Sequence, residues 1–93
     1  MTYKITYTDT YNKKASKFLK KHTSLIEKYQ KTITLLETNP HHPSLRLHKL
    51  EGRLSDCHSV SINLSYRIVI YFLLSDNEIT PIDIGDHKTV YSY

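Results

Sequence analysis

Residues 66–74 constrain the fold of this 93-residue chain more than any other part of its sequence. Apart from Arg67 the segment is apolar on both faces, so it lacks the alternation of apolar and polar residues expected of a strand with one solvent-exposed face. It therefore predicts a central strand that is buried on both sides. Its longest apolar run, residues 68–74, is far shorter than the roughly 20 residues of a membrane-spanning helix. We therefore expect no contact with a membrane.

Elsewhere the spacing of apolar residues switches between strand and helix periods. Alternation over residues 3–8 predicts a strand, and helical spacing then predicts helices over residues 9–22 and 24–38. Ser24 and Glu27 have the spacing of a capping box at the start of the second helix. Besides the central strand, three more strands are predicted, over residues 45–50, 58–64 and 79–84.

This β-α-α-β-β-β-β order predicts an α+β fold. We expect a mostly antiparallel, twisted sheet with a two-helix layer on one face, formed by a single domain over residues 1–93. The lone Cys57 cannot form an internal disulfide and lacks the spacing of a zinc site. These observations favour a cytoplasmic protein in which Cys57 is a small buried apolar residue.

Charge is distributed unevenly along the chain. Residues 1–50 carry ten Lys and Arg against three Asp and Glu, whereas residues 51–93 carry three against six. A positive face would attract a polyanion such as nucleic acid, or an acidic protein. The alternative is that the lysines between residues 13 and 21 only solvate the outside of a helix.

The candidate chemical groups lie mostly in the second half. The sequence has no Gly-rich phosphate loop, no nucleophile elbow, no carboxylate-rich magnesium set and no helical histidine pair for zinc. This disfavours metals and cofactors. Imidazole, guanidinium and phenol groups remain, which can move protons and stabilise negative charge. Cleavage of RNA fits this set: one group deprotonates the 2'-hydroxyl, another protonates the leaving 5'-oxygen, and cations neutralise the phosphorane.

Several of these side chains also have a structural interpretation. Arg67 must reach solvent, a ligand anion or a carboxylate, and Asp56, Asp83 or Asp86 could serve as that carboxylate. Alternation places His48 on the face opposite its apolar neighbours, where it could act or simply be solvated.

Two more histidines differ in their surroundings. His58 shares a face with apolar residues, which favours a packed structural histidine. His87 directly follows the last predicted strand, and Tyr91 comes four residues later, which is one helical turn or a short extended reach.

Taken together, four stretches resemble the RelE/ParE toxin superfamily in order and spacing. They are residues 47–52 (LHKLEG), 56–60 (DCHSV), 66–71 (YRIVIY) and 84–87 (IGDH), the last followed by Val90 and Tyr91. The resemblance implies a RelE-like microbial ribonuclease fold. It further implies the toxin of a type II toxin–antitoxin pair, whose RelE, YoeB and YafQ branches cut messenger RNA in the ribosomal A site.

The resemblance also implies roles for individual residues. Arg67 matches the transition-state arginine, His87 the C-terminal catalytic histidine, Tyr91 the closing aromatic residue, and His48 a histidine of the YafQ branch. We therefore expect His87 and His48 as the acid–base pair, Arg67 as the phosphate clamp and Tyr91 as a stacking or hydroxyl contact. Five further residues are expected to bind RNA: Lys49, Arg53, His58, Ser61 and Lys88.

The sequence departs from the superfamily in the middle of the site. Ser59, Ser61 and Ser65 stand where relatives have lysine, histidine or aspartate. Three interpretations stay open: a ribosome-dependent, metal-independent endoribonuclease without cofactors, a ParE-like inhibitor of DNA gyrase, and a catalytically silent homologue. The expected partners are an acidic antitoxin and, for the nuclease, the ribosome and messenger RNA.

Overall fold

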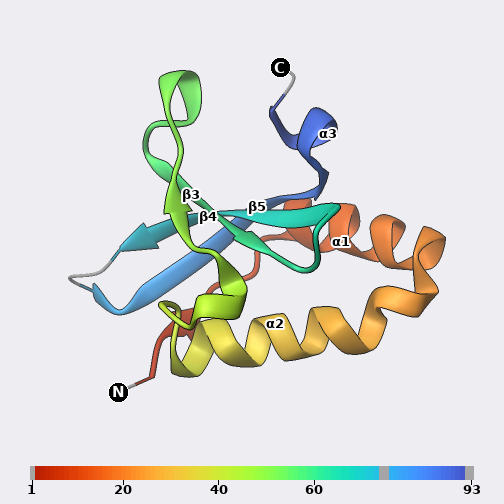
Figure 1. The fold of residues 1–93 in the computed structure, drawn as a ribbon, viewed down its shortest axis with the longest axis horizontal. Coiled ribbons are helices and arrows are strands. Elements are labelled where there is room, and N and C mark those ends of the chain that lie inside the picture. The colour runs from red at the N-terminus through yellow and green to blue at the C-terminus, as the bar shows by residue number, and fades with distance from the viewer. Residues whose placement is uncertain (1, 74–75, 92–93) are drawn as a thin grey trace.

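The computed structural model describes residues 2–73 and 76–91, and its elements follow the predicted order (Figure 1). A short strand β1 (Lys4–Ile5) precedes helices α1 (Asp9–Lys21) and α2 (Ile26–Thr38). Four strands follow, and a final short helix ends the described chain. They are β2 (His48–Lys49), β3 (Cys57–Ser61), β4 (Tyr66–Leu73), β5 (Glu78–Asp86) and α3 (His87–Tyr91).

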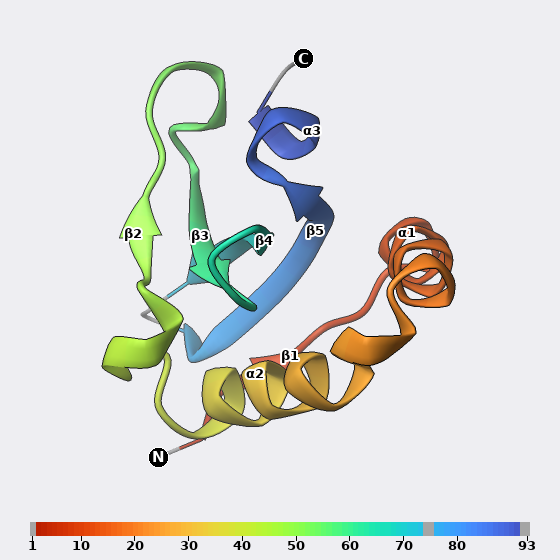
Figure 2. The ribbon, with the colours of Figure 1, turned by 45° about the vertical axis from the view of Figure 1, so that its right-hand side comes forward.

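The strands form one sheet in the order β1-β5-β4-β3-β2. The pairing of β1 with β5 is parallel, and the other three pairings are antiparallel. Helices α1 and α2 cover one face of this sheet, as Figure 2 shows from the side. The predicted α+β fold, with a mostly antiparallel sheet and a two-helix layer, is therefore confirmed.

The prediction for the central strand is confirmed in part. Strand β4 lies between β3 and β5, and its residues Ile68, Val69 and Ile70 are at most 1% exposed. Burial on both faces does not extend along the whole strand, because Tyr71 and Leu73 are 44% and 49% exposed. Leu74, the last residue of the predicted strand, lies outside the described residues.

Two buried clusters lie on opposite faces of the sheet. The larger one, which we call the helix-side core, joins residues of α1 and α2 to Val60, Ile68 and Ile70. The smaller one, the α3-side core, contains Cys57, Val69 and Val90. Because neighbouring residues of a strand point to opposite faces, Ile68 and Val69 separate these two cores.

The predicted capping box is wrong. Residues Thr23–Leu25 form a 3-10 turn, so that α2 begins at Ile26 without a side-chain cap. Ser24 is inside this turn, where it cannot occupy the position before the helix. The turn is closed by the Leu25 amide, which donates to the His22 carbonyl at 2.9 Å.

The strand predicted over residues 45–50 is mostly wrong as well. Pro43–Leu45 form a 3-10 turn that begins with the proline, and Arg46 then adopts a left-handed conformation with φ 50°. Leu45, only 1% exposed, anchors the turn in the helix-side core. Only His48 and Lys49 remain to pair with β3.

The strand predicted over residues 58–64 ends early. The Asn63 side chain accepts hydrogen bonds from the amides of Ser65 and Tyr66 at 2.9 and 2.8 Å, and this closes the reversal into β4. Leu64 is at the tip of the reversal and is 77% exposed.

No helix in residues 2–73 and 76–91 is long and apolar enough to cross a membrane.

Candidate active site

The structure brings the four predicted catalytic side chains to one groove of about 620 Å³. His48 comes from β2, Arg67 from β4, and His87 and Tyr91 from α3. Figures 1 and 2 place α3 and the chain between β2 and β3 at the same end of the sheet. The other lining residues of this groove, which we call the α3 groove, are Lys49, Leu50, Glu51, Arg53 and Leu54.

Helix α3 is fixed at its start and in its last turn. The Asp86 carboxylate accepts a hydrogen bond from the Thr89 amide at 2.7 Å, as a helix cap does. This hydrogen bond holds the pKa of Asp86 below its usual value. Val90 is fully buried in the α3-side core. The cap and this anchor together position His87 and Tyr91 over the groove.

Arg67 is half-buried and forms no ion pair with a carboxylate in residues 2–73 and 76–91. Asp83, one of its expected partners, forms an ion pair with Lys14 instead, with 3.7 Å between Asp83 Oδ1 and Lys14 Nζ. The Arg67 Nε is buried and has no hydrogen-bond partner within the described chain, and its Cζ lies 5.8 Å from the centre of the Tyr91 ring. Because Arg67 lines the α3 groove without a carboxylate partner, its guanidinium is suited to an external anion such as a phosphate.

His87 and Tyr91 contact each other directly. Their ring centres are 4.4 Å apart and the rings are nearly perpendicular, with an angle of 82°. The Tyr91 hydroxyl is buried and has no partner in the described part of the chain, whereas His87 is exposed. His87 can therefore exchange a proton with a ligand while Tyr91 holds its ring in place.

His48 is exposed, and its ring orientation is set by the backbone. Its Nδ1 lies 2.9 Å from the carbonyl oxygen of Arg46. Because a carbonyl can only accept, Nδ1 carries the hydrogen, and in the neutral ring Nε2 has a free lone pair. This contact selects the tautomer whose basic nitrogen is Nε2.

The five predicted RNA-binding residues are distributed over the molecule. Lys49 and Arg53 line the α3 groove, and Lys88 is exposed on α3 outside the lining. Ser61 is paired opposite Arg67 in the sheet but lines a different groove. These assignments stay predictions.

His58 lies on the other face of the sheet, as its apolar neighbours indicated. Its ring contacts Phe72, with 5.4 Å between ring centres, and its Nδ1 is buried with no partner within the described residues. Burial, and then the nearby Lys49, His48 and His41, lower its pKa below the usual value. The structure does not bring His58 to the α3 groove.

Sequence reasoning missed Glu51 in this groove. It is a carboxylate beside the cations, contributed by the turn after β2, and Leu50 and Leu54 line the groove with it. Its position directly before Gly52 at a chain turn was the only available signal.

The described residues contain no group of three or more His, Cys, Asp or Glu that could hold a metal ion.

No protein-family model matches the sequence, and no curated protein matches it significantly. Solved structures do match. YafQ from E. coli superposes with a TM-score of 0.77 at 18% identity, over 96% of this chain and 98% of that one. A chain of the E. coli DinJ–YafQ toxin–antitoxin complex matches with a TM-score of 0.76 at 20% identity, over 98% of this chain and 99% of that one. A YoeB/ParE toxin from Agrobacterium tumefaciens matches with a TM-score of 0.71 at 17% identity, over 90% of this chain and 98% of that one. The chain therefore shares the fold of these solved structures, as its sequence resemblance implied.

Proposed function

We propose that this chain is the toxin of a type II toxin–antitoxin pair and a ribosome-dependent endoribonuclease that cuts messenger RNA without a metal. One observation carries the proposal. Arg67 and the His87–Tyr91 ring pair line the same groove as His48. The fold shared with YafQ and YoeB supports it.

The groove suggests a role for each group. His48, with its free Nε2, accepts the proton of the 2'-hydroxyl, which then attacks the adjacent phosphorus. His87 donates a proton to the leaving 5'-oxygen, while Arg67 neutralises the charge that develops on the phosphorane oxygens. Tyr91 supports both the His87 ring and the guanidinium by direct contact.

Cell-free translation tests the proposal. Purified protein is added to the reaction, and message ends are mapped by primer extension. Wild type should cut within translated codons only when ribosomes are present, and His87→Ala should lower cleavage by about 10² to 10⁴ fold, the usual contribution of one proton-transfer group. His41→Ala is the matched control, because His41 is exposed and lies outside the α3 groove. Intact messages with wild type would refute the nuclease, and a supercoiling assay would then separate a gyrase inhibitor from a silent homologue.

The pH profile of cleavage tests the two histidine roles separately. A base must be deprotonated and an acid protonated, so wild type should give a bell-shaped curve. The residual activity of His48→Ala should lose the fall on the acid side, and that of His87→Ala the fall on the alkaline side. Exchange of these two results would reverse the assigned roles while preserving the pair.

A further inference from the structure

A second groove, of about 610 Å³, lies beside helix α1. It is lined by one side of α1, by Tyr66 at the start of β4, and by residues 83–86 at the end of β5. It shares no lining residue with the α3 groove. We call it the α1 groove and ask which ligand its side chains fit.

Three aromatic rings in mutual contact line the α1 groove. Their ring centres are 4.4 Å apart between Phe18 and His22, 4.7 Å between His22 and Tyr66, and 5.1 Å between Phe18 and Tyr66. Phe18 is 9% exposed and belongs to the helix-side core, so it supports the other two rings. His22 and Tyr66 are only partly buried. A planar ligand in the groove could therefore stack on them.

Lysines of α1 line the same groove. Lys14, Lys17 and Lys21 are three and four residues apart, so they share one face of the helix. Lys14 forms an ion pair with Asp83. Lys17 and Lys21 are exposed and form no ion pair within residues 2–73 and 76–91. Two cations are therefore available to an anion in the groove that holds the aromatic rings.

The two carboxylates of the α1 groove are already engaged. Asp83 accepts a hydrogen bond from the Ile84 amide at 2.9 Å in addition to its ion pair with Lys14. Asp86 accepts one from the Thr89 amide at 2.7 Å. Further oxygen lone pairs can still accept from the amino group of a base, whereas an acidic peptide would be repelled. A ligand with an anionic end and an uncharged, planar end that donates hydrogen bonds fits these groups.

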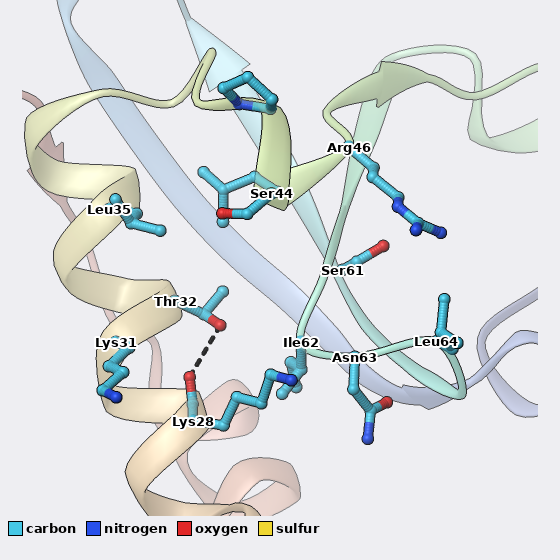
Figure 3. Close-up of a pocket in the computed structure, with 12 residues that line it drawn as sticks. Lys28, Lys31, Thr32, Leu35, Ser44, Arg46, Ser61, Ile62, Asn63 and Leu64 are labelled. Atoms are coloured by element: carbon cyan, nitrogen blue, oxygen red, sulfur yellow. Dashed lines mark hydrogen bonds between the residues drawn. The ribbon is translucent and has the colours of Figure 1, made fainter.

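The groove between α2 and the chain that follows it, drawn in Figure 3, provides a comparison within the molecule. Lys28, Lys31 and Arg46 supply exposed cations there, but no aromatic residue lines that groove. Single-stranded nucleic acid is bound by cations that contact its phosphates together with aromatic rings on which its bases stack. Of these two grooves, the α1 groove alone combines both features.

We propose that the α1 groove binds one unpaired nucleotide. The base stacks on His22 and Tyr66. The phosphate contacts Lys17 and Lys21. The nucleotide can be free or belong to a single-stranded RNA, because the recognised groups are the same in both. This inference stands on the α1 groove and does not rest on the proposed nuclease.

The α1 and α3 grooves meet at one end of the sheet. Tyr66 and Arg67 are neighbours in β4, and Asp86 and His87 are neighbours where β5 passes into α3. In each pair the first residue lines the α1 groove and the second lines the α3 groove. An RNA strand with one nucleotide in the α3 groove could therefore place a nearby nucleotide in the α1 groove.

Fluorescence anisotropy with a synthetic RNA tests the proposal. The probe is a fluorescein-labelled 2'-O-methyl oligoadenylate decamer, which cannot be cleaved through its 2'-oxygen. A decamer with the same backbone but no bases is the control probe. The adenylate decamer should bind the wild-type protein, and the abasic decamer should bind at least about tenfold more weakly, because stacking is lost. Equal binding of the two probes, or no binding of either at millimolar concentration, would overturn the proposal.

Charge variants locate the phosphate contact. Lys17→Glu with Lys21→Glu should weaken binding of both decamers about tenfold. The matched control is Lys28→Glu with Lys31→Glu, an equal charge change in the groove of Figure 3, and it should have a smaller effect. Equal weakening by both double variants would overturn the proposal in favour of general charge attraction.

A variant of the aromatic wall locates the base. Tyr66→Leu keeps an apolar side chain against the helix-side core, and it should weaken the adenylate decamer about tenfold while leaving the abasic decamer unchanged. Circular dichroism confirms that the variant is folded. If it is not, His22→Leu, at a partly buried position after α1, takes its place with the same expectation. Unchanged binding of the adenylate decamer to a folded variant would contradict stacking on this wall.

Adenosine monophosphate distinguishes the two sources of the nucleotide. If it displaces the adenylate decamer and loses this ability in Tyr66→Leu, the groove accepts a free nucleotide. If only the decamer binds and is weakened by Tyr66→Leu, the groove takes its nucleotide from RNA. Both results uphold the site. None of these assays depends on cleavage, so failure of the nuclease proposal in the translation assay leaves the nucleotide result intact, and the reverse also holds.

Discussion

Among the described residues, the sheet face covered by α1 and α2 holds eleven buried core residues, whereas the face that carries α3 holds three. The first face is filled by apolar side chains from five elements and leaves little room for polar groups. The second has Val90 as the anchor of a five-residue helix and leaves Arg67 and His48 beside a groove. The comparison indicates that the face covered by α1 and α2 supplies most of the stability. The face that carries α3 is less densely packed and leaves chemical groups accessible.

The strongest test of this division is a cavity in the helix-side core. Leu36→Ala removes a fully buried side chain and should lower the free energy of unfolding by about 3 kcal/mol. Urea denaturation followed by circular dichroism measures this change. Leu64→Ala, at an exposed position, should stay within about 0.5 kcal/mol of wild type. A similar loss in both variants would contradict the division.

The second test weakens the α3-side core. Val90→Ala should cost about 2 kcal/mol and act first on the docking of α3. Cys57 reports this directly, because it is the only cysteine, is 2% exposed and packs in the same cluster as Val90. Its thiol should react faster with a thiol reagent in Val90→Ala than in wild type. Lys88→Ala, an exposed change on the same helix, should leave the labelling rate unchanged.

A smaller effect is expected from the cap of α3. Asp86→Ala removes the acceptor for the Thr89 amide, so Cys57 labelling should accelerate less than in Val90→Ala. Asp86→Asn keeps a side-chain oxygen that can accept this hydrogen bond. If Asp86→Asn labels as fast as Asp86→Ala, the charge rather than the hydrogen bond stabilises the helix.

The smallest effect concerns pH and returns to the helix-covered face. Because the pKa of His58 is lowered in the folded chain, the unfolded chain takes up a proton at a higher pH than the folded one. Stability should therefore fall as the pH drops below the usual histidine value of about 6.5 toward the folded value. Thermal unfolding between pH 7 and 5 measures this, and His58→Gln should flatten the dependence. An equally steep dependence in His58→Gln would assign it to other groups.

Much of this division could be predicted from local patterns. The apolar pattern of β4 correctly indicated burial on both faces for Ile68, Val69 and Ile70, though not for Tyr71 and Leu73, and Arg67 within it indicated an unusual charge. The apolar neighbours of His58 indicated packing, which its contact with Phe72 confirms. Such predictions succeed where one strand and its alternation decide the outcome.

Other features depend on contacts between distant segments. The 3-10 turn that begins at Pro43 and ends at the left-handed Arg46 shortens β2, and the buried Leu45 holds this turn in place. The apolar spacing of residues 45–50 therefore predicted a strand that is mostly absent. Glu51 comes beside Arg67 and His87 in the α3 groove only after the chain has folded. No local sequence pattern encodes this proximity.

The position of β5 has a consequence for synthesis. It is the last strand in the described chain, yet it lies between β1 and β4 and contributes Ile79 and Ile84 to the helix-side core. Until residues 78–86 have been made, β1 lacks its sheet partner and β4 lacks one of its two. A growing chain can form α1 and α2 early, but these long-range pairings close late and slowly. The α3 groove can therefore form only after β5, because helix α3, which carries His87 and Tyr91, follows the strand that completes the sheet.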